Sequence, residues 1–252
     1  MARSAVQLLH AVLGEHFPMT KLYLGLCVLV FALTSVSGGV SLLGLSNSEA
    51  LRWGALFYAP GARLTRQEPW RYLSAMFVHS GLLHIFFNGT ALWDFGRATE
   101  RRLGSARFVI VFILTGVAGF VLSELWYSWR AVAATTLGAS GGLFGLIGCL
   151  IGYLYARKDP VWKDFLIRVV VFSAILAIAL PVNNAAHFGG FACGVPLGYL
   201  FYRERRPWRR NAVLAVIAGL LVLASFASIG LSYASPVWRA VRQAEIERGM
   251  IH

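Results

Sequence analysis

This chain is poor in charged residues, and the shortage decides its class. Only 13% of its 252 residues are charged, whereas a typical soluble domain has about 25%. Hydrophobic residues make up 58% of the sequence, and they occur in runs close to the roughly 20 apolar residues that a helix needs to cross a bilayer. A soluble globular domain is therefore excluded, and the sequence predicts an all-α, polytopic membrane protein.

Acidic residues are especially scarce: 11 Asp and Glu accompany 23 Lys and Arg, for a net charge of +12. The basic residues gather in alternate gaps between the apolar runs, around residues 97–107, 157–168 and 203–210, while the intervening gaps hold Arg130 or no basic residue. This alternation follows the positive-inside rule and predicts that the amino terminus and the three arginine-rich gaps are cytoplasmic. Because no RNA-binding signature or zinc knuckle is present, we expect no nucleic-acid partner.

Cysteine and metal-binding patterns are also missing. Cys27, Cys149 and Cys193 lie inside apolar runs without metal-ligand spacing, which is typical of small buried side chains and not of a disulfide framework. The His-Glu-x-x-His pattern of zinc proteases is absent, and His79 and His84 are spaced to point to different faces of a helix. We expect neither a metal nor another cofactor.

Seven apolar runs predict seven membrane-spanning helices. The first could instead be a cleaved signal peptide, because Lys21 precedes it and small residues follow, but its distance from Met1 favours an uncleaved span. We expect a short cytoplasmic segment at 1–20, with a surface helix at 1–19. A six-span core at 21–203, a seventh span at 204–230 and an external tail at 231–252 should follow. The runs lie at about 21–37, 79–96, 106–127, 140–156, 165–181, 187–202 and 211–230.

Reactive side chains stand at the outer ends of the second, fourth and sixth predicted spans. A serine hydroxyl is a weak nucleophile until a neighbouring base takes its proton, and His187 is the candidate base for Ser140. His84 and Asn88 lie four residues apart on one helix face, and such polar groups inside a membrane bundle indicate a functional site. We expect them, with Gly138 and the backbone N–H of Ser140, to stabilise a developing oxyanion.

No acid is available to complete a catalytic triad. Only Asp94 and Glu124 fall inside spans; Asp94 lies near the inner end of its span, and Glu124 is expected to face water or lipid headgroups. The sequence therefore predicts a Ser–His dyad. Glycines at spacings of three and four allow the fourth and sixth spans to pack closely: Gly141, Gly145, Gly148, Gly152, Gly190, Gly194 and Gly198. Taken singly, each of these residues also fits a purely structural role in helix packing.

Five motifs make the chain resemble the rhomboid intramembrane serine proteases over about residues 20–203. Gly138-Ala139-Ser140-Gly141 is similar to the family's Gly-x-Ser-Gly motif, and the segment that begins at Ala186-His187 is similar to its Ala-His-x-x-Gly-x-x-x-Gly motif. Phe144 stands where many members have a tyrosine against the histidine ring, and its phenyl face can still stack on His187. The other matches are His79, His84 and Asn88, the pair Trp70-Arg71, and Gly96, Glu100 and Gly104.

The resemblance implies a protease with Ser140 as nucleophile, His187 as general base, His84 and Asn88 as oxyanion stabilisers and His79 in support. It also implies a water-filled cavity open to the exterior or periplasm, a cell-membrane location, and substrates that are single-span membrane proteins within the lipid bilayer. A protein of the same fold that binds membrane helices without cutting them remains the alternative. A transporter or channel would predict inverted repeats, and the Ser and His motifs each occur only once.

Overall fold

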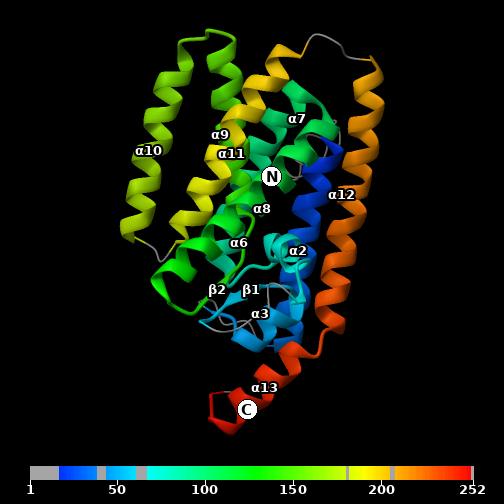
Figure 1. Cartoon of the computed structure of the whole chain (residues 1–252), viewed down its shortest axis with the longest axis vertical. Helices are drawn as coiled ribbons and strands as arrows, with labels where there is room; N and C mark the ends of the chain where they lie inside the picture. The colour runs from blue at the N-terminus through cyan, green and yellow to red at the C-terminus, as the bar shows by residue number, and fades with distance from the viewer. Residues whose placement is uncertain (1–16, 39–43, 61–66, 180–181, 205–207, 251–252) are drawn as a thin grey trace, which may run out of the picture.

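The computed structural model describes residues 17–38, 44–60, 67–179, 182–204 and 208–250, and it is a bundle of long helices (Figure 1). Within this part of the chain, α2, α8 and α12 are long and apolar enough to cross a bilayer, and a bent pair at Arg71–Phe77 and Leu82–Leu103 makes a fourth span if it is counted as one. Helix α9 is apolar but shorter. The predicted all-α membrane fold is confirmed, while the count of seven spans and the domain boundaries stay predictions.

Each predicted span corresponds to a helix, and two short strands join the loops between them. The long elements are α2 (Pro18–Gly38), α6 (Leu82–Ala91) with its π-helical continuation η2 (Leu92–Gly96), α8 (Ser105–Arg130), α9 (Ser140–Ala156), α10 (Val161–Ala179), α11 (Asn184–Arg203) and α12 (Trp208–Ala234). The short elements are α3 (Asn47–Trp53), β1 (Leu56–Tyr58), α5 (Arg71–Ser74), η1 (Ala75–Phe77), α7 (Arg97–Leu103), β2 (Ala134–Thr136) and α13 (Val237–Glu247).

Helix α8 is the centre of the bundle, with α9, α11 and α12 packed around it. Phe108 and Phe112 of α8 are fully buried, and both rings contact the ring of Tyr23 on α2, with centroids 6.2 and 5.3 Å away. Phe77 stacks on the same tyrosine at 5.7 Å. Aromatic rings bury large apolar areas and prefer such stacked and tilted pairs. This cluster ties α2 and the start of the α6 region to the central helix.

Helices α9 and α11 touch backbone to backbone along a line of glycines. A Cβ atom added at Gly190, Gly194 or Gly198 would overlap a carbonyl oxygen of α9, and one added at Gly148 or Gly152 would overlap a carbonyl oxygen of α11. Only glycine permits the two helix backbones to lie this close together, because any larger residue would force the helices apart. We call these contacts the glycine seam. It fixes the lateral distance between the helices that carry Ser140 and His187.

Asn183 fixes the start of α11. Its Oδ1 accepts a hydrogen bond from the backbone N–H of Ala186 at 3.1 Å, and its backbone oxygen accepts one from the N–H of His187. The Nδ2 group of Asn183 donates to the hydroxyl of Ser123 on α8 at 2.6 Å. An asparagine at this position satisfies N–H groups that the first helical turn leaves without partners. Asn183 therefore caps α11 and anchors the cap to the central helix.

Helix α7 holds the first span through a buried carboxylate. Glu100 accepts hydrogen bonds from the backbone N–H and the hydroxyl of Thr20, at 2.9 and 2.7 Å, and from the hydroxyl of Ser105 at 2.6 Å. Its side chain thus joins the start of α2 to the start of α8. A buried carboxylate needs such donors, because an unpartnered charge in this position is costly. Glu100 therefore has a structural role in this fold.

The long connection between α2 and α6, called here the first connection, is folded around Arg71, which is fully buried. Its guanidinium pairs with Glu68 and donates to the carbonyl oxygens of Leu51 and Ala55. The carboxyl-terminal segment packs here too: the hydroxyl of Ser235 donates to Glu68.

Helix α12 extends past the predicted end at residue 230, and α13 packs on α3. The tail predicted from 231 is thus partly helical, whereas the surface helix predicted at 1–19 lies almost entirely outside the described residues.

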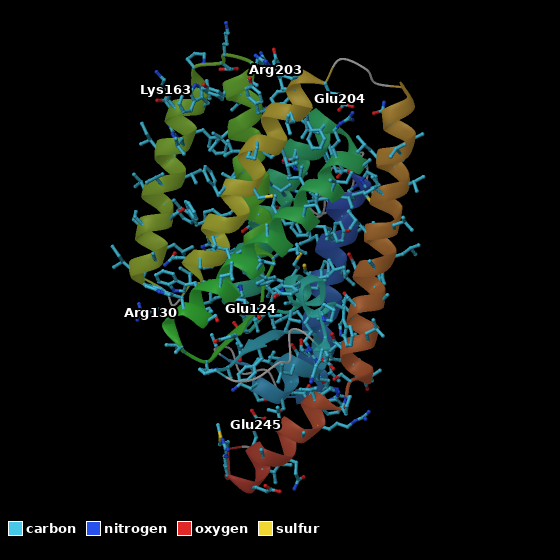
Figure 2. The ribbon with its side chains drawn as sticks, viewed as in Figure 1. Glu124, Arg130, Lys163, Arg203, Glu204 and Glu245 are labelled. Atoms are coloured by element: carbon cyan, nitrogen blue, oxygen red, sulfur yellow. The ribbon has the colours of Figure 1, made fainter. Side chains whose placement is uncertain are left out.

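Charged side chains distinguish the two ends of the bundle. Figure 2 shows Lys163, Arg203 and Glu204 at one end, and Arg130 and Glu245 toward the other. The first of these ends also carries α7 with its arginines (Figure 1). We call it the arginine-rich end. Ser140 and His187 lie in the first turns of α9 and α11, whose last turns reach the arginine-rich end, so both belong to the opposite half of the bundle.

Replacing Gly198 by alanine should destabilise the fold, because the new methyl group would overlap the carbonyl oxygen of Cys149. Overpacking of this kind costs about 1–3 kcal/mol. The matched control is Gly25→Ala on α2, where an added Cβ has no neighbour within 4 Å. Thermal unfolding in detergent should show a lower midpoint for G198A and no loss for G25A. A G198A midpoint at or above that of the unchanged protein would contradict the glycine seam.

Replacing Asn183 by alanine should loosen the first turn of α11, because it removes both the cap and the bond to Ser123. Loss of an asparagine cap costs about 0.5–2 kcal/mol. Hydrogen–deuterium exchange should become faster at the amides of Ala186 and His187. Asn184→Ala is the control, because Asn184 is exposed and lies one residue further along. Equal exchange in the two variants would refute the capping role.

Candidate active site

Ser140 and His187, predicted as a pair, are hydrogen-bonded to each other. The Oγ of Ser140 lies 2.8 Å from the Nε2 of His187. Ser140 is the first residue of α9 and His187 lies in the first turn of α11, so the pair bridges the two helices at one end of the glycine seam. A hydroxyl bonded to an imidazole is the arrangement that nucleophilic catalysis requires, because the ring can take the hydroxyl proton.

Phe144 holds the imidazole of His187 in place. The two rings are stacked, with centroids 4.3 Å apart and an interplanar angle of 17°. Phe144 is one turn after Ser140 on α9, so Ser140 and the ring that stacks on His187 come from the same helix. The predicted stacking of phenyl and imidazole rings is therefore present. His187 itself is 8% exposed, which leaves its ring little freedom to reorient.

Gly138 and His84 are in direct contact beside Ser140. Gly138 has φ +108°, a backbone conformation that L-residues with a side chain rarely adopt. A Cβ at this position would lie 2.7 Å from the Nε2 of His84, so the glycine also provides space for the imidazole. Its backbone N–H donates to the carbonyl oxygen of Ala75 at 2.8 Å. Gly138 thus leaves room for the imidazole of His84 beside Ser140, and its amide proton already has a partner.

The hydrogen bonds of His84 indicate which of its nitrogens carries the proton. The Nδ1 atom accepts from the backbone N–H of Ser80 at 3.4 Å and lies 3.1 Å from the Ser80 hydroxyl. A backbone N–H is always a donor, so Nδ1 is the acceptor, and the neutral ring carries its proton on Nε2. This Nε2–H is the atom that faces Gly138. His84 therefore presents a donor beside Gly138, two residues before Ser140.

His79 and Asn88 both contact His84, His79 through its ring and Asn88 through a hydrogen bond to the backbone. The ring of His79 is fully buried and packs edge-on against His84, with centroids 5.0 Å apart. Asn88 donates one Nδ2 hydrogen to the carbonyl oxygen of His84 at 2.9 Å, and its second hydrogen remains for another acceptor. His79 thus packs the ring of His84, and Asn88 is bonded to the backbone of the same residue.

The two carboxylates of the predicted spans take no part in the dyad. Glu124, expected to face water or headgroups, is partly buried and accepts a hydrogen bond from the hydroxyl of Tyr72 on α5, which packs against α8. In the part of the chain that the structure describes, no carboxylate bonds to His187, and no group of three His, Cys, Asp or Glu side chains is placed to hold a metal.

Two residues that contribute to the site were not predicted from the sequence. Ser80 orients His84, and Asn183 caps the helix of His187. The signal for Asn183 was present, because asparagine is a preferred cap and stands four residues before the histidine. Ser80 gave no such signal, because its contact depends on the bend between η1 and α6, an angle of 96° between the two halves of the helix pair.

Similar proteins are known from bacteria and plants. "Rhomboid protease GlpG" of Klebsiella pneumoniae is 30% identical over 194 residues, which are 73% of this chain and 63% of the relative. "Rhomboid protease GluP" of Bacillus subtilis is 28% identical over 69% of this chain and 33% of its own length. "RHOMBOID-like protein 7" of Arabidopsis thaliana is 30% identical over 72% and 58%. The chain thus spans less than two thirds of the length of these relatives.

The sequence model of the family "Rhomboid domain" matches residues 66–204, more than half of the chain. The matched segment begins in the first connection and ends just after α11, so it includes Ser140, His187, His84 and Gly138. The resemblance noted in the sequence motifs is confirmed by this match. The chain belongs to the rhomboid family.

Proposed function

We propose that this protein is an intramembrane serine endopeptidase that cleaves single-span membrane proteins near the outer leaflet. The observation that carries the proposal is the 2.8 Å hydrogen bond between the Oγ of Ser140 and the Nε2 of His187 in a chain of the rhomboid family. Two of its relatives are named rhomboid proteases. A dyad with this contact needs no metal and no cofactor to open a peptide bond.

In the first step His187 takes the proton of Ser140 while Oγ attacks the carbonyl carbon of the scissile peptide. His187 then gives this proton to the leaving nitrogen, and the peptide bond breaks to leave an ester on Ser140. Phe144 keeps the imidazole plane fixed through both transfers, because its ring lies 4.3 Å from that of His187. In the second step His187 takes a proton from water as the water oxygen attacks the ester carbon, and it returns this proton to the Oγ of Ser140 as the ester bond breaks and the acid leaves.

The negative charge of the tetrahedral intermediate needs donors that are in place before the reaction. The Nε2–H of His84 and the backbone N–H of Ser140 are our candidates. Ser140 starts α9, where backbone N–H groups lack intrahelical partners and the positive end of the helix dipole lies. The free hydrogen of Asn88 Nδ2 is a third candidate, and His79 holds His84 by edge-on packing. Gly138 provides the space in which these groups meet.

The proposed orientation follows from charge. With the arginine-rich end in the cytoplasm, as the positive-inside rule requires, the dyad opens to the exterior or periplasm of the cell membrane. The peptide carbonyls of a transmembrane substrate are bonded within its helix, so a short segment must unwind before Ser140 can attack. The substrate class is what the family resemblance implies, and hydrolysis of the ester requires that water reach the dyad.

Replacing Ser140 by alanine should abolish cleavage, because no other hydroxyl is bonded to His187 in the described part of the chain. We expect a loss of about 10³-fold or more, measured as release of a soluble fragment from a single-span reporter in vesicles. Ser173→Ala is the control, since the Ser173 hydroxyl bonds to the Val169 carbonyl oxygen of its own helix and, among the described residues, to no other group. Normal turnover by a folded S140A protein would refute the role of Ser140.

If S140A retains the reporter without cutting it, and the unchanged protein also releases no fragment, the non-proteolytic helix-binding alternative is favoured. S140A should still unfold cooperatively, with a midpoint lowered by no more than the loss of one hydrogen bond, about 0.5–1.5 kcal/mol, because alanine fits the space of serine at the start of α9. This comparison separates loss of chemistry from loss of fold.

A further inference from the structure

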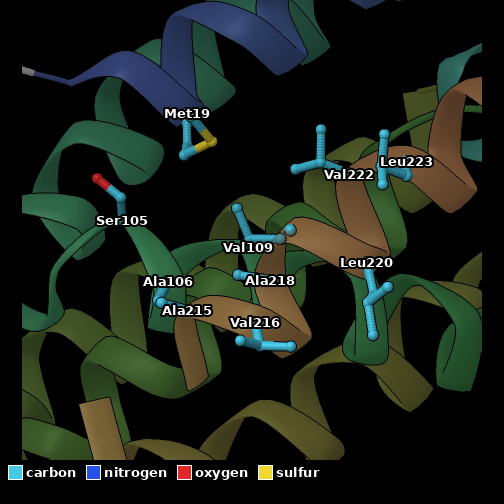
Figure 3. Close-up of a pocket in the computed structure, with 11 residues that line it drawn as sticks. Met19, Ser105, Ala106, Val109, Ala215, Val216, Ala218, Leu220, Val222 and Leu223 are labelled. Carbon is cyan, nitrogen blue, oxygen red and sulfur yellow. The ribbon is translucent and has the colours of Figure 1, made fainter. Parts of the chain in front are cut away.

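Helix α12 packs closely on the bundle only in its second half. Along its first half an apolar groove opens between α12, α2 and α8 (Figure 3). Val216 and Leu220 in this half are 64% and 61% exposed. Further along, the side chains of four serines are buried: Ser225, Ser228, Ser232 and Ser235. The firm contacts of the carboxyl-terminal part of the chain therefore lie in the half of the bundle that contains the dyad (Figure 1).

The end of α12 and helix α13 hold the first connection, so we call residues 232–247 the carboxyl-terminal clamp. The Oγ of Ser232 lies 3.1 Å from the Oγ of Ser74 on α5. The hydroxyl of Ser235 donates to Glu68, and this carboxylate pairs with the fully buried arginine of α5. Both contacts are buried. They bind the clamp to the part of the first connection that leads into η1.

Arg52 on α3 is enclosed by aromatic rings of the clamp. Its guanidinium carbon lies 4.9 Å from the ring centroid of Tyr233 and 4.8 Å from that of Trp238. Its Nη2 donates to the Tyr233 hydroxyl at 3.0 Å. Trp238 is buried and packs on Leu51, which is also buried. A cation gains most from an aromatic face when both are withdrawn from water, so these contacts fasten α13 to α3.

The first connection in turn holds the segment that leads to Ser140. Strand β1, which follows α3, pairs antiparallel with β2. Two residues after β2, the backbone N–H of Gly138 donates to the carbonyl oxygen of Ala75 in η1 at 2.8 Å. Both partners of this segment, β1 and η1, belong to the first connection. The position of Gly138 therefore depends on how firmly that connection is held.

The contact between α13 and α3 lies outside the part of the chain that matches the family model. The match covers residues 66–204, so α3, β1 and the clamp fall beyond its two ends. Strand β2 and Gly138, which they support, fall inside it. Elements outside the matched segment thus hold a part of the candidate site that lies within it.

We propose that the carboxyl-terminal clamp is a positioning element of the active site, which acts through the first connection on residues 134–138. Trp238 is its central residue, because its ring contacts both an apolar and a charged side chain of α3. The clamp keeps Gly138 beside the imidazole of His84, and so keeps the proposed oxyanion donors in place before the reaction. The dyad itself is held by the glycine seam. The catalytic part of this inference rests on the proposed function.

Replacing Trp238 by alanine tests the clamp without proteolysis. Because the first connection would be held less firmly, the amide of Gly138 should exchange with deuterium about tenfold faster. The amide of His187 should keep its rate, because it is bonded to Asn183 in the cap of α11. The measurement is hydrogen–deuterium exchange of the detergent-purified protein, resolved to single amides by mass spectrometry.

Three further variants serve as controls. Trp238→Phe keeps an aromatic ring at the contact and should restore most of the protection of Gly138. Trp129→Ala removes a tryptophan that is 74% exposed and packs on Trp126 of its own helix, so both exchange rates should stay unchanged. Arg52→Gln breaks the same contact from α3 and should reproduce the effect of W238A. It also carries the test if W238A does not unfold cooperatively.

Cleavage of the single-span reporter tests the catalytic part. W238A should lower kcat about fivefold and change KM by less than about twofold, because donors are misplaced while the binding contacts of the substrate remain. Trp238→Phe should recover most of the lost kcat, and W129A should keep it. A variant that merely destabilised the fold would lose activity in step with its folded fraction and leave the KM and kcat of the folded protein unchanged.

Unchanged exchange at Gly138 in folded W238A or R52Q, or equal acceleration at Gly138 and His187, would overturn the coupling. Faster exchange at Gly138 with an unchanged kcat would overturn the positioning role. If the unchanged protein cuts no reporter, the proposed function fails, while the exchange at Gly138 still decides whether the clamp acts on the site.

Discussion

The structure of this protein depends on the closeness of α9 and α11. Where Gly190, Gly194 and Gly198 face α9, the carbonyl oxygens of one helix occupy the volume that side chains of the other would need. In a membrane there is little hydrophobic force between helices, so close backbone packing is a main source of their association. The same contact brings the first turns of both helices together, and the bond between Ser140 and His187 lies there. Fold stability and the proposed chemistry therefore share one constraint.

The imidazole rings of His187 and His84 are held in place by neutral contacts. His187 is stacked by Phe144, and its helix is capped by Asn183, which is bonded in turn to α8. His84 receives a backbone N–H on one nitrogen and presents the other to Gly138. In a bundle with few carboxylates, neutral contacts of this kind replace the acid of a triad in orienting an imidazole. The proposed dyad is thus consistent with the low charge of the whole chain.

Much of this arrangement could be predicted from the sequence, because apolar runs, glycine spacing and arginine distribution are local signals. They predicted the helices, the seam, and the meeting of Ser140 with His187. Contacts between distant segments could not be predicted this way. Examples are the Tyr72–Glu124 bond, the packing of α13 on α3, and the pairing of β1 with β2. Such pairs depend on loop paths that no periodicity encodes, and the orientation of His84 depends on a bend in the chain.

The most direct test of the account is covalent labelling with a fluorophosphonate probe in membranes, with the modified residue located by mass spectrometry. Only a serine activated by a neighbouring base reacts readily with such a probe. The account predicts one adduct, on Ser140, and its loss when His187 is replaced by asparagine in a protein that still folds. An adduct on another serine, undiminished labelling of Ser140 without His187, or no labelling of the folded protein would contradict it.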